Sequence, residues 1–171
     1  VLASTVLPSF AQSTTPRETL VINTDKGEID IGLRPDLAPK HVEQIKALAD
    51  EGFYDGVVFH RVIDGFMAQT GDPTGTGMGG SERPDLKAEF SKEPFKRGTV
   101  GMARSSSPDS ANSQFFIMLA DGDFLNGEYT VVGQVTKGMD VVDKIKKGDE
   151  ANNGQVENPD KMVTAKVVEA K

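Results

Sequence analysis

The segment FHRVIDGFMAQTGD, residues 59–72, contains two short apolar runs on either side of an Asp-Gly turn. The runs predict two β-strands, in which successive side chains point to opposite faces. Arg61 then lies on the same face as Phe59 and Ile63, so a cation interrupts an otherwise apolar strand face. These residues alone leave two interpretations open: Arg61 is a functional group, or it is a surface or ion-pairing residue beside an ordinary core.

A second segment, NSQFFI at residues 112–117, has a related pattern. In an extended chain Gln114 and Phe116 share one face of the strand, just as Met67 and Gln69 share a face in the first segment. Both segments thus pair a glutamine with a large apolar side chain on one face. Taken alone, this pattern is equally compatible with Met67 and Phe116 being ordinary core residues.

The remaining apolar patterns predict a mainly β protein with two helices. Alternating or short apolar runs that indicate strands occur at residues 19–24, 28–33, 57–63, 66–70, 98–103, 114–119, 130–135 and 161–169. Helical spacing predicts helices at 39–51 and 140–147, each followed by a glycine. Because the strands are short and do not alternate with helices, we expect a closed or nearly closed antiparallel sheet whose ends are covered by the two helices.

Composition excludes several classes of function. The 171 residues fit one domain, and 19 basic against 26 acidic residues give a net charge of −7, which disfavours nucleic-acid binding. The chain has no cysteine, which excludes disulfides, thiolate catalysis and Cys-ligated metals. Only two histidines are present, without the i, i+4 spacing of a zinc pair, and no run approaches the ~20 apolar residues of a membrane span. We therefore expect no metal, no cofactor and no membrane partner.

Two motif matches are better explained as loops. The GTGMGG stretch at residues 75–80 formally matches a dinucleotide-binding motif, but no helical pattern follows it. The serines at 105–107 could form a hydrolytic triad with His60, but they lack a nucleophile elbow and belong to a Ser/Pro/Asp-rich segment. We expect His60 to be a packed, hydrogen-bonded core residue.

FHRVIDGFMAQTGD, together with SANSQFFIML about 40 residues later, closely resembles the cyclophilin family of peptidyl-prolyl cis–trans isomerases. The resemblance runs from about Thr19 to Glu169 and looks most like the bacterial periplasmic branch. It implies an eight-stranded antiparallel closed β-barrel capped by two α-helices, and an enzyme that accelerates rotation about X–Pro bonds without a cofactor. The alternative is a proline-peptide binding module or chaperone with incidental catalysis, which would not need Arg61.

The resemblance also assigns roles to residues. It places the catalytic arginine at Arg61, assisted by Gln69. It implies that substrate is bound by Phe66, Met67, Ala103, Arg104, Gln114, Phe116, Phe124, Leu125 and Tyr129. Phe124 stands where the family often has Trp, Tyr129 where it often has His, and Arg104 where it often has Asn. Because the indole N–H donor is missing, the resemblance implies that cyclosporin binds weakly.

The N-terminal residues suggest export. Residues 1–11 are mostly apolar or small and end in Ser9-Phe10-Ala11, which is typical of the end of a secretory signal peptide cleaved near Ala11. We expect residues 1–18 to be a signal remnant and flexible arm, and 19–171 to be the isomerase domain. The expected location is the periplasm, with the cytoplasm as the alternative. Expected partners are proline-containing peptides and unfolded exported proteins, and the resemblance implies a monomer.

Overall fold

The protein is described by a computed structural model that covers residues 18–169. The expected leader, its cleavage at Ala11 and the flexible arm lie outside the described residues, except for Glu18, which begins the first strand. The strands are β1 (Glu18–Thr24), β2 (Gly27–Leu33), β3 (Arg61–Ile63), β4 (Met67–Thr70), β5 (Thr99–Met102), β6 (Phe115–Met118), β7 (Val131–Lys137) and β8 (Met162–Glu169). They form one sheet in the order β3-β4-β6-β5-β7-β2-β1-β8, and every pairing is antiparallel.

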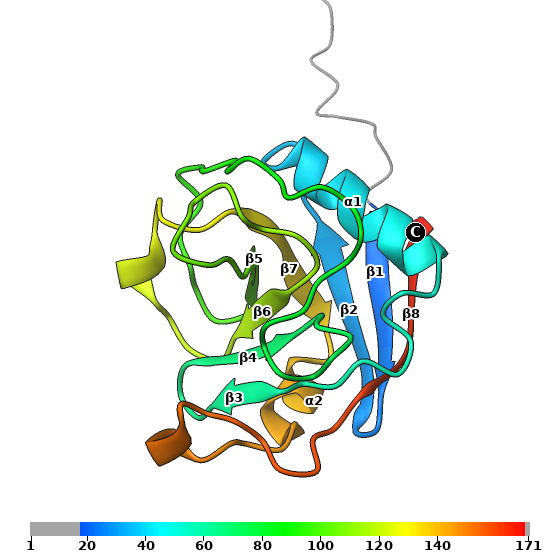
Figure 1. The fold of residues 1–171 in the computed structure, drawn as a ribbon, viewed down its shortest axis with the longest axis vertical. Helices are drawn as coiled ribbons and strands as arrows, with labels where there is room; N and C mark the ends of the chain where they lie inside the picture. The colour runs from blue at the N-terminus through cyan, green and yellow to red at the C-terminus, as the bar shows by residue number, and fades with distance from the viewer. Residues whose placement is uncertain (1–17, 170–171) are drawn as a thin grey trace, which may run out of the picture.

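The sheet curves into a barrel whose two edge strands meet incompletely (Figure 1). Between β3 and β8 there is no strand ladder, and an isolated bridge joins Val58 to Lys161. Backbone bonds from Phe59 N to Asp160 O (2.9 Å) and from Met162 N to Val57 O (2.8 Å) complete this contact. The predicted strand number and direction are confirmed, but full closure was overstated. For the same reason the run predicted at 57–63 forms a strand only from Arg61 onward.

The two faces of the sheet carry different clusters of apolar side chains. Val62, Ala68 and Ile117 belong to the main core, which also contains the buried apolar residues of both helices. The opposite face carries a second cluster with Met67 and Phe116 among its buried members. Strand alternation therefore separates the core of the barrel from a second face on which a site can be built.

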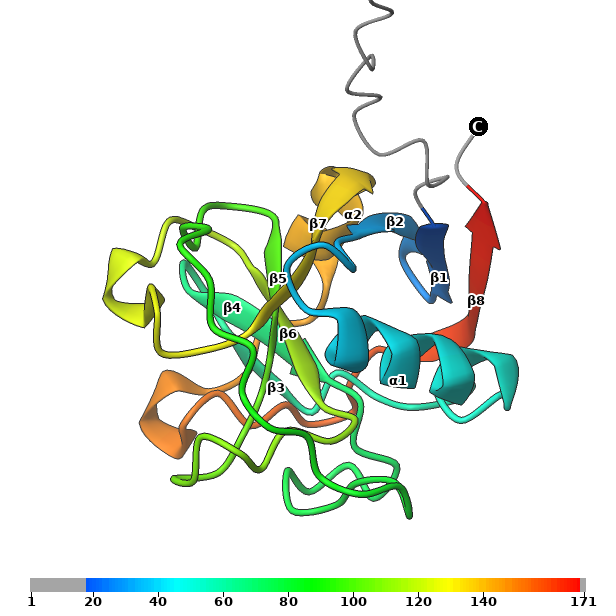
Figure 2. The ribbon, with the colours of Figure 1, turned by 90° about the horizontal axis from the view of Figure 1, so that it is seen from above.

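Two helices close the ends of the barrel. Helix α1 (Pro39–Asp50) has proline in its first turn and buries an apolar stripe, and helix α2 (Met139–Lys144) buries Val142 completely. Figures 1 and 2 place them at opposite ends of β1 and β2. Helix α2 is shorter than predicted, because Ile145 is extended and Lys147 Nζ donates to the carbonyls of Asp143 (2.5 Å) and Ile145 (3.0 Å). No helix in residues 18–169 has the length and apolarity that crossing a membrane requires.

Long connections surround the second face. Residues 71–98 link β4 to β5 and cross in front of β2 and α1 in the view of Figure 1. Two 3-10 helices, η1 (Asp123–Leu125) and η2 (Glu150–Asn152), lie in other connections and were not predicted, since each spans only three residues. Periodicity cannot reveal so short an element.

Candidate active site

One row of residues runs across the second face from strand to strand. Arg61 on β3 is opposite Gln69 on β4, Gln69 is opposite Phe116 on β6, and Phe116 is opposite Gly101 on β5. Neighbouring strands lie about 4.8 Å apart, so the register alone brings these four positions together. The two glutamine-containing segments of the sequence thus meet as adjacent strands.

Phe116 packs flat against a neighbouring ring because the next position in the row lacks a side chain. Its ring centroid lies 5.8 Å from that of Phe95, with 19° between the ring planes. A Cβ on Gly101 would stand 2.7 Å from atoms of both rings, so only glycine leaves room for this stack. Tyr129 contacts Phe116 edge-on at 5.7 Å. Together these rings form a rigid aromatic surface.

A small pocket of about 120 Å³ opens beside this surface. It is lined by Arg61, Phe66, Met67, Gln69, Ala103, Arg104, Phe116, Leu125 and Tyr129. Pockets for drug-sized ligands usually measure about 300–1,000 Å³, so this one suits a single small ring. Six of its nine lining residues are apolar or aromatic, and within residues 18–169 its only charged lining groups are the guanidiniums of Arg61 and Arg104.

Arg61 lies at the pocket edge, and its hydrogen-bond partners in the described part of the chain are all neutral. Its Nη1 donates to Gln69 Oε1 (3.1 Å), its Nε donates to Asn153 O (3.0 Å) and its Nη2 donates to Asn153 Oδ1 (3.2 Å). The side chain is half-buried, and this burial lowers the pKa of its guanidinium, while Tyr129 acts in the opposite direction. The guanidinium stays charged near neutral pH, because the ordinary pKa of an arginine side chain lies far above 7. Its charge is therefore fixed in place without being neutralised by a carboxylate.

The glutamines extend this arrangement toward the glycine-rich segment. Gln69 Nε2 donates to Gln114 Oε1 (2.8 Å), and Gln114 Nε2 donates to the carbonyls of Gly77 (3.0 Å) and Gly79 (2.9 Å). This chain of bonds sets the direction of both side-chain amides, so that Gln69 turns its oxygen toward Arg61. Gln114 does not line the small pocket but an adjoining one of about 510 Å³.

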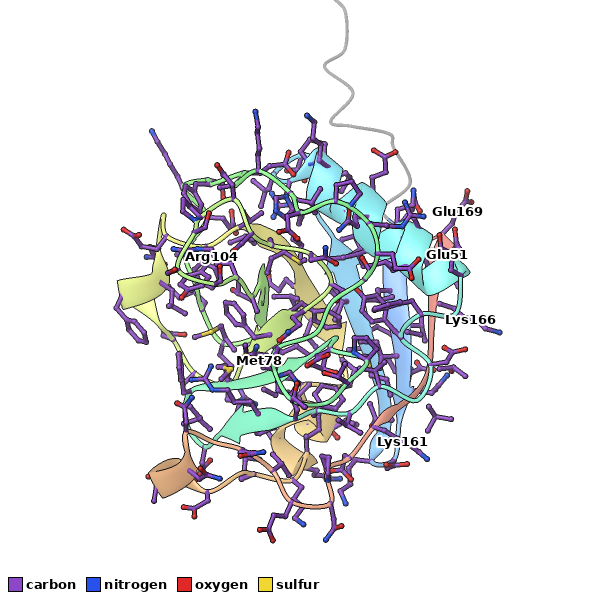
Figure 3. All side chains as sticks on the ribbon, in the orientation of Figure 1. Glu51, Met78, Arg104, Lys161, Lys166 and Glu169 are labelled. Carbon is purple, nitrogen blue, oxygen red and sulfur yellow. The ribbon has the colours of Figure 1, made fainter. Side chains whose placement is uncertain are left out.

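The glycine-rich segment is held by a buried carboxylate. Asp72 accepts hydrogen bonds from the backbone amides of Thr74 (2.8 Å), Thr76 (3.1 Å), Gly77 (2.6 Å) and Gly79 (3.1 Å). No helix begins here, as predicted, but the segment is fixed by these bonds. Its Met78 is highly exposed and lies on the same side of the molecule as Arg104 (Figure 3). Glu51 and Lys166 mark the other side.

Other sequence predictions near the site have mixed outcomes. Phe124 does not line the small pocket; it is 71% exposed and its ring centroid lies 5.5 Å from that of Phe66. His60 is packed as predicted, but neither ring nitrogen has a hydrogen-bond partner among residues 18–169, so the prediction of a bonded histidine was wrong. Burial lowers the pKa of His60; Asp72 raises it and Arg61 lowers it further.

The structure also bears on the alternatives to isomerase chemistry. The Ser105 hydroxyl bonds to the Ser110 hydroxyl (2.7 Å), so no Ser–His pair for hydrolysis forms within the described part of the chain. The same part contains no group of three or more His, Asp or Glu residues arranged to hold a metal ion.

Sequence reasoning missed Asn153, the backbone and side-chain partner of Arg61. Asn153 has a left-handed backbone (φ 57°) and precedes Gly154, a dipeptide that signals a turn. The turn was recognisable, but its contact with Arg61 spans 92 residues of sequence. Local patterns carry no information about such a contact.

Comparison with known proteins identifies the family. A family model described as "Cyclophilin type peptidyl-prolyl cis-trans isomerase/CLD" matches residues 19–167. The chain belongs to the cyclophilin-type peptidyl-prolyl cis–trans isomerases. A "Probable peptidyl-prolyl cis-trans isomerase" of Brucella suis biovar 1 is 61% identical over 168 residues, covering 92% of this cyclophilin and 86% of the relative. A Helicobacter pylori peptidyl-prolyl cis-trans isomerase is 46% identical over 132 residues, covering 75% and 80%.

A solved structure agrees with the fold. A Cryptosporidium parvum cyclophilin-type isomerase, crystallised in the presence of the dipeptide Ala-Pro, superposes with a TM-score of 0.79 at 28% identity and covers 90% of this cyclophilin and 99% of that chain. By its family and its curated relatives, this cyclophilin is an enzyme that isomerises X–Pro peptide bonds. The predicted family and activity are confirmed.

Proposed function

We propose that Arg61 is the catalytic group and that the 120 Å³ pocket beside it holds the proline ring of the substrate. One observation carries this proposal: a half-buried guanidinium lies at the edge of a pocket lined mainly by apolar and aromatic residues, and its hydrogen-bond partners within residues 18–169 are all neutral. Such a cation keeps its full charge for a bound peptide. A guanidinium paired with a carboxylate would present much less positive charge to a bound peptide.

The reaction needs a hydrogen-bond donor of this kind. Rotation about an X–Pro bond has a barrier of about 18–20 kcal/mol, because the nitrogen lone pair is delocalised into the carbonyl. In the twisted state the nitrogen becomes pyramidal and its lone pair can accept a hydrogen bond. A donor that bonds this nitrogen stabilises the twisted state more than the planar one, and such differential binding accelerates the reaction. No bond is made or broken, so no nucleophile takes part.

The expected contribution of Arg61 is one to two powers of ten. A hydrogen bond to a charged group contributes about 1.5–3 kcal/mol, and each tenfold in rate requires about 1.4 kcal/mol. The remaining acceleration comes from desolvation of the amide and from holding the ring still while the carbonyl side turns. Phe116, Met67 and Leu125 supply the apolar walls, and Gln69 is placed to hold the peptide backbone.

The test is the isomerisation rate of variants at Arg61. We expect Arg61→Ala to lower kcat/KM for an Ala-Pro peptide by about 10- to 100-fold, because the donor to the prolyl nitrogen is lost. Arg61→Lys should retain part of the rate, since it keeps a cationic donor. The control is Arg83→Ala, which removes an arginine that pairs with Glu51 and lines no pocket described above. A near wild-type rate for folded Arg61→Ala would refute the proposal.

We further propose that the enzyme assists folding of exported proteins in the periplasm. The small and apolar residues that end at Ala11 support this location, as does the resemblance to the periplasmic branch. Fractionation of cells that make the native full-length protein tests it: recovery in the periplasmic fraction is expected. Recovery with cytoplasmic enzymes would overturn this location and leave the isomerase activity unaffected.

Cyclosporin should bind weakly because Phe124 has no N–H group to donate to it. A matched substitution tests this directly. Phe124 is 71% exposed, so Phe124→Trp should fold normally and increase inhibition by cyclosporin. Equal inhibition of the two forms would show that the missing donor is not the cause.

A further inference from the structure

Arg104 is a second fixed cation at the proline pocket. Its Nε and Nη2 donate to the backbone carbonyl of Glu128 (3.1 and 2.9 Å), and its Nη1 donates to Ser105 O (3.0 Å). Its guanidinium carbon also lies 4.6 Å from the ring centroid of Tyr129, a cation–π distance. These partners are all uncharged, so Arg104 is held in place with its charge uncompensated.

The position of Arg104 makes this charge available to substrate. Arg104 lines the small pocket and also the adjoining pocket of about 510 Å³, so it belongs to the wall between the two. Of the residues that the structure describes, Arg61 and Arg104 are the two charged groups on the small pocket, and none of its lining residues is a carboxylate. The larger pocket contains one carboxylate, Asp85, whose Oδ1 accepts a bond from Asn112 Nδ2 (3.0 Å). A locally positive site thus lies on a protein with a net charge of −7.

We propose that Arg104 is a specificity-determining residue that favours substrates with an acidic side chain immediately before the proline. This inference rests on the proposed binding of the ring in the small pocket. Consecutive Cα atoms are 3.8 Å apart, so the residue before the proline must lie against the wall of that pocket. Ala103 and Arg104 line both pockets and Gln114 lines the larger one, so a peptide whose ring fills the small pocket can continue into the larger pocket beside Arg104.

The expected preference is modest and electrostatic. Arg104 is already ordered by Glu128, Ser105 and Tyr129, so little side-chain freedom is lost when a carboxylate approaches. The site is open to water, and partly exposed ion pairs contribute little. We therefore expect an increase in kcat/KM of about threefold for Glu-Pro over the isosteric Gln-Pro peptide. Salt at about 1 M should remove it, because the Debye length falls to roughly 3 Å.

The experiment compares four peptides that differ only beside the proline: Glu-Pro, Gln-Pro, Lys-Pro and Gln-Pro-Glu. Exchange rates are measured by NMR for the wild type, Arg104→Gln and Arg104→Lys, each checked for folding by thermal unfolding. The readout is the ratio of kcat/KM between peptides within one variant, so a general loss of activity cancels. We expect the Glu-Pro to Gln-Pro ratio to fall toward one in Arg104→Gln and to persist in Arg104→Lys, with Lys-Pro disfavoured by the wild type.

A ratio in Arg104→Gln equal to that of the wild type would overturn the inference. So would a wild-type ratio of one at low salt, which can be measured even if a variant does not fold. If kcat/KM rises more for Gln-Pro-Glu than for Glu-Pro, each relative to Gln-Pro, the assignment to the residue before proline would be overturned. Failure of the proposed mechanism gives a separate result, because it is decided by kcat/KM of the Arg61 variants for an Ala-Pro peptide.

Discussion

Asp72 offers the sharpest test of how the site is held together. Its buried carboxylate accepts bonds from the amides of Thr74, Thr76, Gly77 and Gly79, and from the Thr74 hydroxyl (2.7 Å). Burial alone would raise the pKa of Asp72, but these bonds outweigh it and lower the pKa to about 2. Asp72→Asn keeps the size of the side chain and removes the charge.

The lowered pKa sets the magnitude. The ordinary aspartate value is 3.8, and each pH unit between the folded and unfolded values corresponds to about 1.4 kcal/mol, so the charged form of Asp72 stabilises the fold by about 2 kcal/mol. The folded pKa is the lower of the two. This stability is therefore fully present above about pH 4 and is lost as the pH falls toward 2.

Denaturant unfolding of both forms between pH 7 and pH 2 measures this effect. We expect Asp72→Asn to be less stable than the wild type by at least about 2 kcal/mol at pH 7, with the difference shrinking below pH 4. The control is Asp109→Asn. The Asp109 carboxylate is exposed and accepts a hydrogen bond from the backbone amide of Ala88 (2.9 Å). A wild-type to Asp72→Asn difference that stays constant from pH 7 to pH 2 would refute the electrostatic reasoning.

The same substitution should also reach the active site. Gln114 is held by the carbonyls of Gly77 and Gly79, whose amides bond to Asp72. A looser segment would free the Gln114 amide and, through it, Gln69. We expect a lower kcat/KM in folded Asp72→Asn at pH 7, whereas Asp109→Asn should match the wild type.

Three further predictions concern the pocket and the stability of its surroundings. Phe116→Leu should weaken binding of an Ala-Pro peptide in a calorimetric titration, because the ring forms the pocket wall; unchanged affinity would contradict its assignment. Gly101→Ala should destabilise the fold by about 1–3 kcal/mol in urea and lower activity, since the new Cβ would stand 2.7 Å from the ring of Phe116. Arg97→Gln should lower the free energy of unfolding by less than about 1 kcal/mol, because the ion pair of Arg97 with Asp143 is exposed. A difference in unfolding free energy between the two forms that persists in about 1 M salt would contradict this.

Alternation in the sequence predicted the strands well, because each strand places one face on the main core. The pattern placed Met67 and Gln69 on one face correctly, and the antiparallel register then brought Arg61, Gln69 and Phe116 into one row. The prediction was wrong for Phe59, which is buried in the main core with Val62 and not beside Arg61, because the strand begins only at Arg61. What alternation could not predict is which strands are neighbours. That order depends on packing across the whole barrel, which local patterns in the sequence do not contain.

Predictions failed where backbone bonds come from distant parts of the chain. The strand expected from residue 57 begins only at Arg61, because Phe59 bonds to Asp160 outside any ladder. The second helix ends before its glycine, because the amide of Lys146 donates to the Asp160 carboxylate (2.8 Å) instead of continuing the helix. Both failures depend on one acidic residue more than ten positions away in sequence. Helical and strand periodicity depend only on residues close in sequence, so neither can reveal such a partner.

The glycine-rich segment illustrates how composition can mislead about order. Its glycines predict a flexible loop, since glycine restricts the backbone least. A single buried carboxylate reverses this expectation, because the glycines let four amides within residues 74–79 turn toward one acceptor. A Cβ at Gly79 would stand 2.2 Å from Asp72 Oδ1, so the missing side chain is a condition for the bonds that order the segment. The same property that makes the free chain mobile therefore allows a rigid support for Gln114, and through Gln114 for the side chains around Arg61.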